Sequence, residues 1–135
     1  MMLNLNGSHF RLLERSLDVA SLRQSVISNN IANAETPHFK RSEVVFESLL
    51  QQRMTDRSIT GLRTDPRHIF IGKKSQNIKP LIQIDQNSVL NNNLNNVDLD
   101  YEMAELAKNQ LRYNTLVNQV SHEIKMAKTA LEARA

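Results

Sequence analysis

The feature that most constrains this chain is a long heptad repeat in its last third. Apolar residues follow one another there at alternating steps of four and three residues, interrupted once by Gln110. This C-terminal stripe consists of Leu99, Met103, Leu106, Tyr113, Val117, Val120, Ile124, Ala127 and Leu131. Because a straight helix has about 3.6 residues per turn, a stripe repeating every ~3.5 residues would drift by roughly 90° over this length unless the helix supercoils against a partner. The repeat therefore predicts a helix that pairs with other helices.

A shorter stripe with the same spacing opens the chain, and it also contains one glutamine. Its members are Phe10, Leu13, Leu17, Ala20, Gln24, Ile27 and Ile31. A second apolar column (Leu12, Val19 and Val26) lies beside this stripe, so the helix is expected to contact more than one neighbour. If the two helices form an antiparallel hairpin, Gln24 is expected to lie beside Gln110 as a buried polar pair that specifies register.

The ends of both helices are marked by capping and breaking residues. Ser8 is expected to cap the first helix, which should end near Asn33 because Pro37 disfavours helical angles in the residue before it. Asp98 is a good cap for the second helix, which is expected over 99–134 with a length of roughly 54 Å. Negative charge near its start suits the helix dipole and comes from Asp100, Glu102 and Glu105.

The middle of the chain has no comparable repeat. A short helix is expected over Val44–Arg53, burying Phe46, Leu49 and Leu50, and short strands over 69–71 and 81–84, before an asparagine-rich linker. The sequence thus predicts a mainly α fold, in which two long terminal helices pair as a coiled-coil-like core beside a small irregular or partly β middle segment. The expected divisions are 1–37, 38–97 and 98–135.

Composition argues against chemistry as the main task. Seventeen basic and fourteen acidic side chains give a net charge of +3, far from the dense basic face of a nucleic-acid binder. The chain has no cysteine, its four histidines are scattered, and its three glycines form no phosphate-binding loop, so neither an enzyme nor a metal or cofactor site is expected. The first ten residues lack the apolar run of a signal peptide, so if the protein leaves the cytoplasm, it is expected to do so without a cleaved signal.

One segment carries a specific resemblance. Residues 28–41 read Ser-Asn-Asn-Ile-Ala-Asn-Ala-Glu-Thr-Pro-His-Phe-Lys-Arg. This resembles the N-terminal motif of the bacterial flagellar rod and hook family, in which a helix ends in Asn-Ile-Ala-Asn and the chain turns through Thr-Pro-Gly-aromatic-Lys. The residues that match the motif are Asn30, Ile31, Ala32, Asn33, Thr36, Pro37, Phe39 and Lys40.

Two further segments are similar to the smallest rod subunit of that family. They are residues 95–103, followed by Asn109 and Tyr113, at the start of the C-terminal helix, and residues 64–69 in the middle. Two turns depart from the family pattern. His38 stands where the family has glycine, and residues 93–94, Asn-Leu, stand where it has Asp-Gly. Neither turn can use the freedom of glycine at positive φ.

The resemblance implies a structural subunit of the proximal rod of the flagellar basal body, part of the drive shaft between the membrane ring and the hook. It implies export through the flagellar type III apparatus to the periplasmic side of the inner membrane. The implied partners are other copies of the chain, other rod subunits, and the rod-adaptor and membrane-ring proteins, with no nucleic acid and no small-molecule substrate. The two stripes are then expected to be assembly surfaces.

Two alternatives remain open at this point. A soluble coiled-coil adaptor or export chaperone would also carry long heptad repeats, but it would fold and dimerise in the cytoplasm instead of being secreted. A regulatory helical protein that binds nucleic acid would show binding that weakens steeply with salt.

Overall fold

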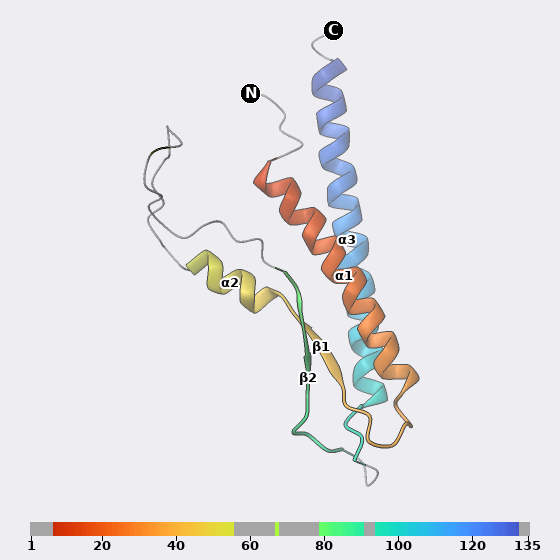
Figure 1. Cartoon of the computed structure of the whole chain (residues 1–135). Coiled ribbons are helices and arrows are strands. Elements are labelled where there is room, and N and C mark those ends of the chain that lie inside the picture. The colour runs from red at the N-terminus through yellow and green to blue at the C-terminus, as the bar shows by residue number, and fades with distance from the viewer. Residues whose placement is uncertain (1–6, 56–66, 68–78, 91–93, 133–135) are drawn as a thin grey trace. The chain divides into compact units, whose positions relative to one another are not determined.

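The computed structural model of the chain describes residues 7–55, 67, 79–90 and 94–132. Within these residues the chain is mainly helical, with a long helix near each end and a small two-stranded antiparallel sheet between them (Figure 1), which confirms the predicted fold class. In chain order the elements are α1 (Ser8–Ala32), β1 (Ser42–Val45), α2 (Glu47–Thr55), β2 (Leu81–Ile84) and α3 (Leu99–Glu132). None of the helices in the described part has an apolar stretch long enough to cross a lipid bilayer.

The chain forms two compact units. The first unit combines Met1–Val44 with Ile82–Ala135 and contains both long helices, and the second is Val45–Leu81 and contains α2. The short helix predicted over Val44–Arg53 starts later, at Glu47, because its first two residues belong to β1. Phe46 is buried as expected, and β2 confirms the strand predicted over 81–84. The strand predicted over 69–71 lies outside the described residues.

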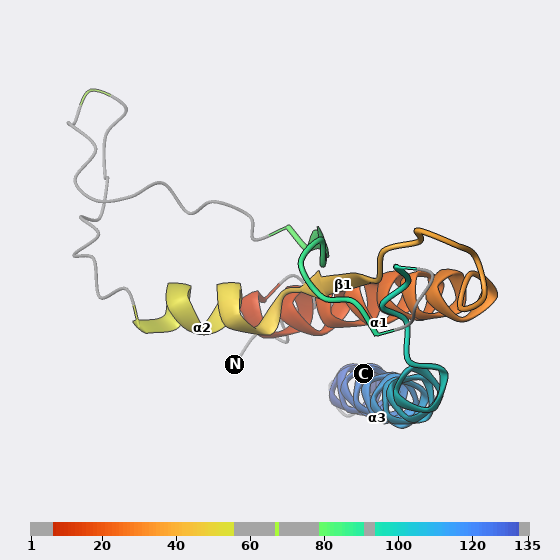
Figure 2. The same cartoon turned by 90° about the horizontal axis from the view of Figure 1, so that it is seen from below.

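In the first unit α1 and α3 lie side by side and antiparallel (Figures 1 and 2). At one end His9 Nδ1 is 3.6 Å from Glu123 Oε1, and near the other end Asn30 Nδ2 donates to Glu102 Oε2 at 3.1 Å. Between these two contacts, Asn109 Nδ2 donates to Gln24 Oε1 at 3.2 Å. The expected pairing of Gln24 with Gln110 is therefore wrong by one residue.

That shift of one residue divides the C-terminal stripe. The buried or half-buried face of α3 repeats at steps of three and four except for one step of seven, where Tyr113 is exposed, and it includes Glu102, Leu106, Asn109, Leu116, Val120, Glu123, Ala127 and Ala130. Leu106, Val120 and Ala127 belong to the predicted stripe, although Leu99 and Tyr113, in the same column, are exposed. Every second position of the stripe, counting Gln110, points elsewhere. Those members, all exposed, are called the outer column here: Met103, Gln110, Val117, Ile124 and Leu131.

The predicted stripe on α1 is buried or half-buried throughout, so it contacts the interior of the unit as expected. The second apolar column also has a neighbour: Val19 is buried, and Figure 2 shows β1 running alongside α1. Arg23 Nη2 reaches the carbonyl oxygen of Val44 at 3.4 Å across this contact. Val19 and Val26 of the second column are thus covered, whereas its third member, Leu12, is 37% exposed.

The helix ends follow the sequence signals with one exception. Gly7, not Ser8, is the N-cap of α1, and it makes no side-chain capping bond. α1 ends at Ala32, where Asn33 Nδ2 donates to the carbonyl oxygen of Asn29 at 2.8 Å. At the start of α3, Asp98 Oδ1 accepts hydrogen bonds from the backbone N–H groups of the two residues that follow Leu99, at 3.0 and 3.2 Å.

Both turns that depart from the family pattern have left-handed backbone angles. Among the described residues, His38 (φ 60°) and Leu94 (φ 61°) are the non-glycine residues with positive φ. One backbone hydrogen bond spans each turn. The N–H of Phe39 donates to the Thr36 carbonyl oxygen at 3.3 Å, and the N–H of Leu90 donates to the Asn95 carbonyl oxygen at 3.0 Å. The tertiary structure therefore imposes the conformation that glycine would adopt without strain.

Replacing His38 or Leu94 by glycine is expected to raise the free energy of unfolding by up to about 1 kcal/mol per site. Left-handed angles cost a residue with a Cβ about 1–2 kcal/mol, and the greater freedom of glycine in the unfolded chain offsets part of the gain. Urea unfolding of each variant measures the difference. Alanine at the same positions keeps the Cβ and should show no gain; equal effects of glycine and alanine would contradict the explanation.

Candidate assembly site

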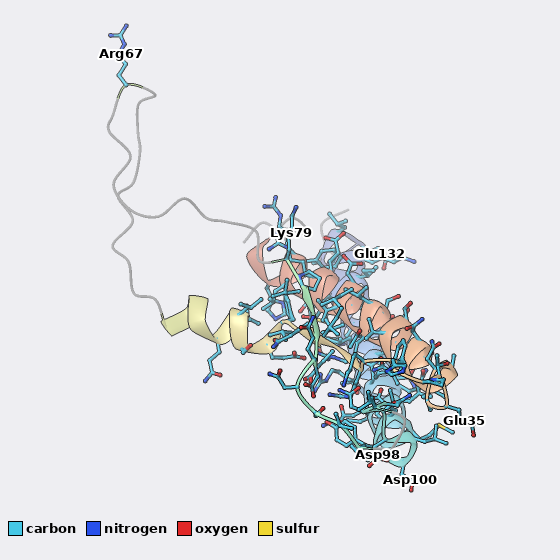
Figure 3. The ribbon with its side chains drawn as sticks, turned by 60° about the horizontal axis from the view of Figure 1, so that its bottom comes forward. Glu35, Arg67, Lys79, Asp98, Asp100 and Glu132 are labelled. Carbon is cyan, nitrogen blue, oxygen red and sulfur yellow. The ribbon has the colours of Figure 1, made fainter. Side chains whose placement is uncertain are left out.

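Where α1 ends and α3 begins, the first unit contains a cluster of polar side chains, all buried except Arg41, whose side chain is 20% exposed. We call this cluster the polar joint, and it consists of Asn30, Arg41, Asn95, Asn96 and Glu102. It joins three segments that are far apart in the sequence, namely the end of α1, the turn that leads into β1, and the linker with the first turn of α3. Figure 3 shows Asp98, Asp100 and Glu35 at this end of the helix pair, and Glu132 towards the other end.

The centre of the polar joint is the carboxylate of Glu102, which has no exposed surface. Its Oε1 accepts from Arg41 Nε at 2.5 Å, and its Oε2 accepts from Asn30 Nδ2 at 3.1 Å. Asn30, also fully buried, donates to the carbonyl oxygen of Ser42 at 2.8 Å and accepts from the Ser42 N–H at 3.0 Å. A buried charge needs both a counter-charge and hydrogen bonds, and Glu102 has both.

Arg41 is held from several sides. Its Nη1 lies 3.2 Å from Glu43 Oε2, and its guanidinium carbon lies 4.9 Å from the centre of the Tyr101 ring, a cation–π contact. Burial is the largest influence on the pKa of Arg41 and lowers it, but the hydrogen bonds and negative charges of Glu102 and Glu43 together raise that pKa above its ordinary value. The guanidinium therefore stays charged beside the buried carboxylate.

Asn95 closes the turn after α1. Its Nδ2 lies within hydrogen-bond distance of three backbone carbonyl oxygens, those of Asn33 (3.1 Å), Ala34 (2.9 Å) and Thr36 (2.8 Å). Its Oδ1 accepts from the backbone N–H of Val97 at 2.7 Å. These carbonyl groups follow the end of α1, and two of them also accept backbone bonds within the turn, Asn33 from the Thr36 N–H and Thr36 from the Phe39 N–H. Asn95 therefore adds side-chain hydrogen bonds that fix the turn against the linker.

Asn96 connects the turn to the loop after β2. Its Oδ1 accepts from the Arg41 N–H at 2.7 Å, while its Nδ2 donates to the Asp85 carbonyl oxygen and to Ser88 Oγ, both at 2.9 Å. The loop is ordered by Asp85, whose carboxylate accepts from the Ser88 hydroxyl and from two backbone N–H groups. The Ser88 hydroxyl, and then these N–H groups, lower the pKa of Asp85 below its ordinary value. Lys40 Nζ, which donates to the Ser88 carbonyl oxygen at 3.0 Å, adds a smaller effect.

The structure brings part of the family motif into the polar joint and its surroundings. Asn30 is central, Asn33 and Thr36 form the turn through a 3.3 Å bond between their side chains, and Lys40 binds the loop after β2. Ile31 and Phe39 are half-buried, whereas Ala32 and Pro37 are exposed. The matched residues therefore have a structural reason to occur together, since several of them position the same turn.

Sequence reasoning missed the two charged members of the joint. Glu102 was expected to act through the helix dipole, but its side chain is buried in an ion pair with Arg41. The available signal was that both residues lie in segments that resemble the family, which gives no indication that they touch. Only the antiparallel register of α1 and α3 brings them together.

The outer column is the second part of the candidate site. Its apolar members are strongly exposed, from 38% for Val117 to 66% for Leu131. Three of its members, Met103, Val117 and Ile124, each precede a half-buried or buried member of the same stripe by three residues. Because residues three apart are neighbours on a helix surface, the outer column lies next to the contact with α1. Exposed apolar residues repeated along a long helix are typical of a protein interaction surface. In the described part of the chain, no group of three or more His, Cys, Asp or Glu residues could hold a metal ion.

Comparison with known proteins agrees with this geometry. Residues 13–40 match the family described as flagella basal body rod protein. The flagellar basal body rod protein FlgB of Borreliella burgdorferi is 42% identical over 87% of this chain and 91% of its own length. The chain belongs to the flagellar basal body rod protein family. FlgB of Bacillus subtilis is 38% identical over 88% of this chain and 89% of its own length, and FlgB of Yersinia ruckeri is 31% identical over 98% of both chains.

The part of this family member that matches the family description, residues 13–40, covers most of α1 and the turn after it. It therefore includes three residues that make contacts at this end of the unit. Asn30 binds Glu102 on α3, Asn33 accepts a hydrogen bond from Thr36 within the turn, and Lys40 binds the loop after β2. Of the polar joint itself, Asn30 lies within the matched residues, and the other four members lie outside them.

Replacing Arg41 with methionine is expected to lower the free energy of unfolding by about 3 to 5 kcal/mol, because it leaves a fully buried carboxylate without its counter-charge. Adding Glu102→Leu should recover more than half of that loss, since the pair is then replaced by apolar side chains. Urea unfolding of both single variants and the double variant provides a double-mutant cycle.

The matched control is Glu43→Gln. Glu43 also contacts Arg41, but its side chain is 62% exposed, so this change should cost less than about 1 kcal/mol. Additive effects of the Arg41 and Glu102 substitutions would show that the buried ion pair does not determine the stability of the first unit.

Proposed function

We propose that this chain is a structural subunit of the rod of the bacterial flagellar basal body, and that the outer column of α3 joins it to neighbouring subunits. The relatives named as rod proteins match nearly the whole chain, which supports the role. The outer column supports the mode of assembly, because a single copy of the first unit leaves it exposed. A structural role needs no reacting groups, and the long helices provide the surfaces along which subunits can pack.

The geometry of α3 suits a subunit that adds helices side by side. Its contact with α1 uses one side of the stripe and leaves the adjoining side for another helix, as in bundles of more than two helices. Leu106, Val120 and Ala127 lie between the two sides, so a second helix would extend the existing interface. Other copies and other rod subunits are the partners we propose for this surface.

We further propose that the chain reaches the periplasmic side of the inner membrane through the flagellar type III export apparatus. There it would meet the rod-adaptor and membrane-ring proteins, at the proximal end of the rod. The alternative of a cytoplasmic adaptor or chaperone is less well supported, because relatives that cover almost all of this chain are named as rod proteins. Recovery of the chain in purified basal bodies tests its proposed location. Met1 or its neighbour still present in the recovered chain tests export without a cleaved signal.

Placing glutamate at Val117 or Ile124 is expected to stop rod assembly and motility without impairing solubility or export. Both side chains are exposed in the single chain, so the charge costs the folded subunit little, but a neighbouring helix would bury it, at a cost of several kcal/mol per contact. Motility in soft agar and the yield of basal bodies measure the loss.

The matched controls are Thr115→Glu and His122→Glu, which put the same charge on exposed positions of α3 outside the outer column. They should assemble better than the outer-column variants. If all four variants assembled equally well, the outer column would not be an assembly surface, whatever the location of the protein in the cell.

A further inference from the structure

The outer column contains one polar residue, Gln110, between Met103 and Val117. The structure separates it from the polar pair inside the unit. Asn109, its neighbour in sequence, donates to Gln24 at 3.2 Å and to the carbonyl oxygen of Ala20 at 2.9 Å. Gln110 itself is exposed, and among the residues that the structure describes it has no hydrogen-bond partner for its side-chain amide.

The apolar part of the outer column cannot define by itself how far along its axis a partner helix docks. Its members recur every seven residues, so a partner shifted by one heptad, roughly 10 Å, would meet a nearly identical row of apolar side chains. Gln110 is the one member that breaks this equivalence. A buried polar side chain is unfavourable without a hydrogen-bond partner, so the axial offset that supplies one is selected.

A helix of a second copy of this chain is the occupant that fits the column. From Met103 to Leu131 the column extends roughly 42 Å, which requires a partner of similar length, and within the described residues α1 and α3 have 25 and 34 residues. The column is continuous with the α1–α3 interface, so a helix docked there becomes the third helix of an existing pair. The residues one turn further along, on the side away from α1, are all exposed, and the first three are uncharged, as suits a close helix contact: Ala107, Asn114 and Ser121. The fourth, Lys128, is charged and lies 3.7 Å from Glu132 at the end of the column.

We propose that Gln110 determines the axial offset at which a helix of a second copy docks on the outer column. The inference rests on the proposed function, because it needs copies of the chain to assemble side by side. In this arrangement Asn109 and Gln24 specify register within a copy, and Gln110 specifies register between copies.

Site-specific photo-crosslinking in assembled rods tests the proposal. A photoreactive phenylalanine analogue at Ile124 is activated in basal bodies, and the adducts are sized and mapped by mass spectrometry. We expect adducts with twice the mass of the chain that map to one short segment. In a Gln110→Leu background, adducts should also appear at segments about seven residues away. Gln110→Met, which keeps the length of the side chain without its amide, should behave in the same way.

Asn114→Leu is the control, because it removes an exposed amide beside the outer column and should leave a single adduct segment. A single segment in both Gln110 variants would overturn the proposal while leaving the rod function intact. Adducts with a different protein, or no adducts in rods that contain the chain, would overturn the docking of a second copy. Absence of the chain from basal bodies would instead overturn the proposed function itself.

Discussion

The first unit depends on one buried carboxylate. Glu102 is removed from water at the start of α3, and it is tolerated there because Arg41 supplies the opposite charge and Asn30 supplies a further hydrogen bond. These three side chains come from three different segments of the chain. Any arrangement that separates them leaves a charge buried and unpaired, which is far more costly than the loss of an ordinary apolar contact. The ion pair therefore restricts how α1, β1 and α3 can be combined.

Apolar packing and polar contacts have different roles in this unit. The stripes on α1 and α3 provide burial, but a pattern that repeats every seven residues gives similar burial at several registers. The polar joint removes this ambiguity at one end of the helix pair, and the bond between Asn109 and Gln24 removes it near the middle. Asn95 and Asn96 extend the same principle to the turn and the loop, where they bind backbone groups that have no partner in a helix or sheet.

One side of α3 is thus buried against α1, and the adjoining side is exposed. Towards α1, its interface contains polar and charged residues that accept only one register. Away from α1, the outer column exposes large apolar side chains that the described residues of the first unit leave uncovered. A family of proteins that builds an axial structure requires both properties, because each subunit must have one shape and must also bind its neighbours.

Sequence alone was enough to predict the two long helices, the turn after α1, the strand over 81–84 and the family, whereas it missed β1 and placed the start of α2 three residues too early. These features depend on local signals, such as the spacing of apolar residues, the capping by Asp98, and the effect of Pro37 on the residue before it. They also depend on a motif around Asn30 that departs from the family pattern only at His38. Local signals of this kind act within a few residues, so they can be read without knowing what the helix packs against.

Tertiary structure decided which face of α3 meets α1. Glu102 and Met103 are adjacent in the sequence, but their side chains point about 100° apart around the helix, so hydrophobicity alone favoured Met103 for the interface. The buried position went to Glu102 because Arg41 and Asn30 lie opposite it, and the rotation that this requires leaves the outer column exposed. Glu102 pairs with residues more than sixty positions away in sequence. Such a pairing forms only in the folded chain, so no local sequence pattern predicts it.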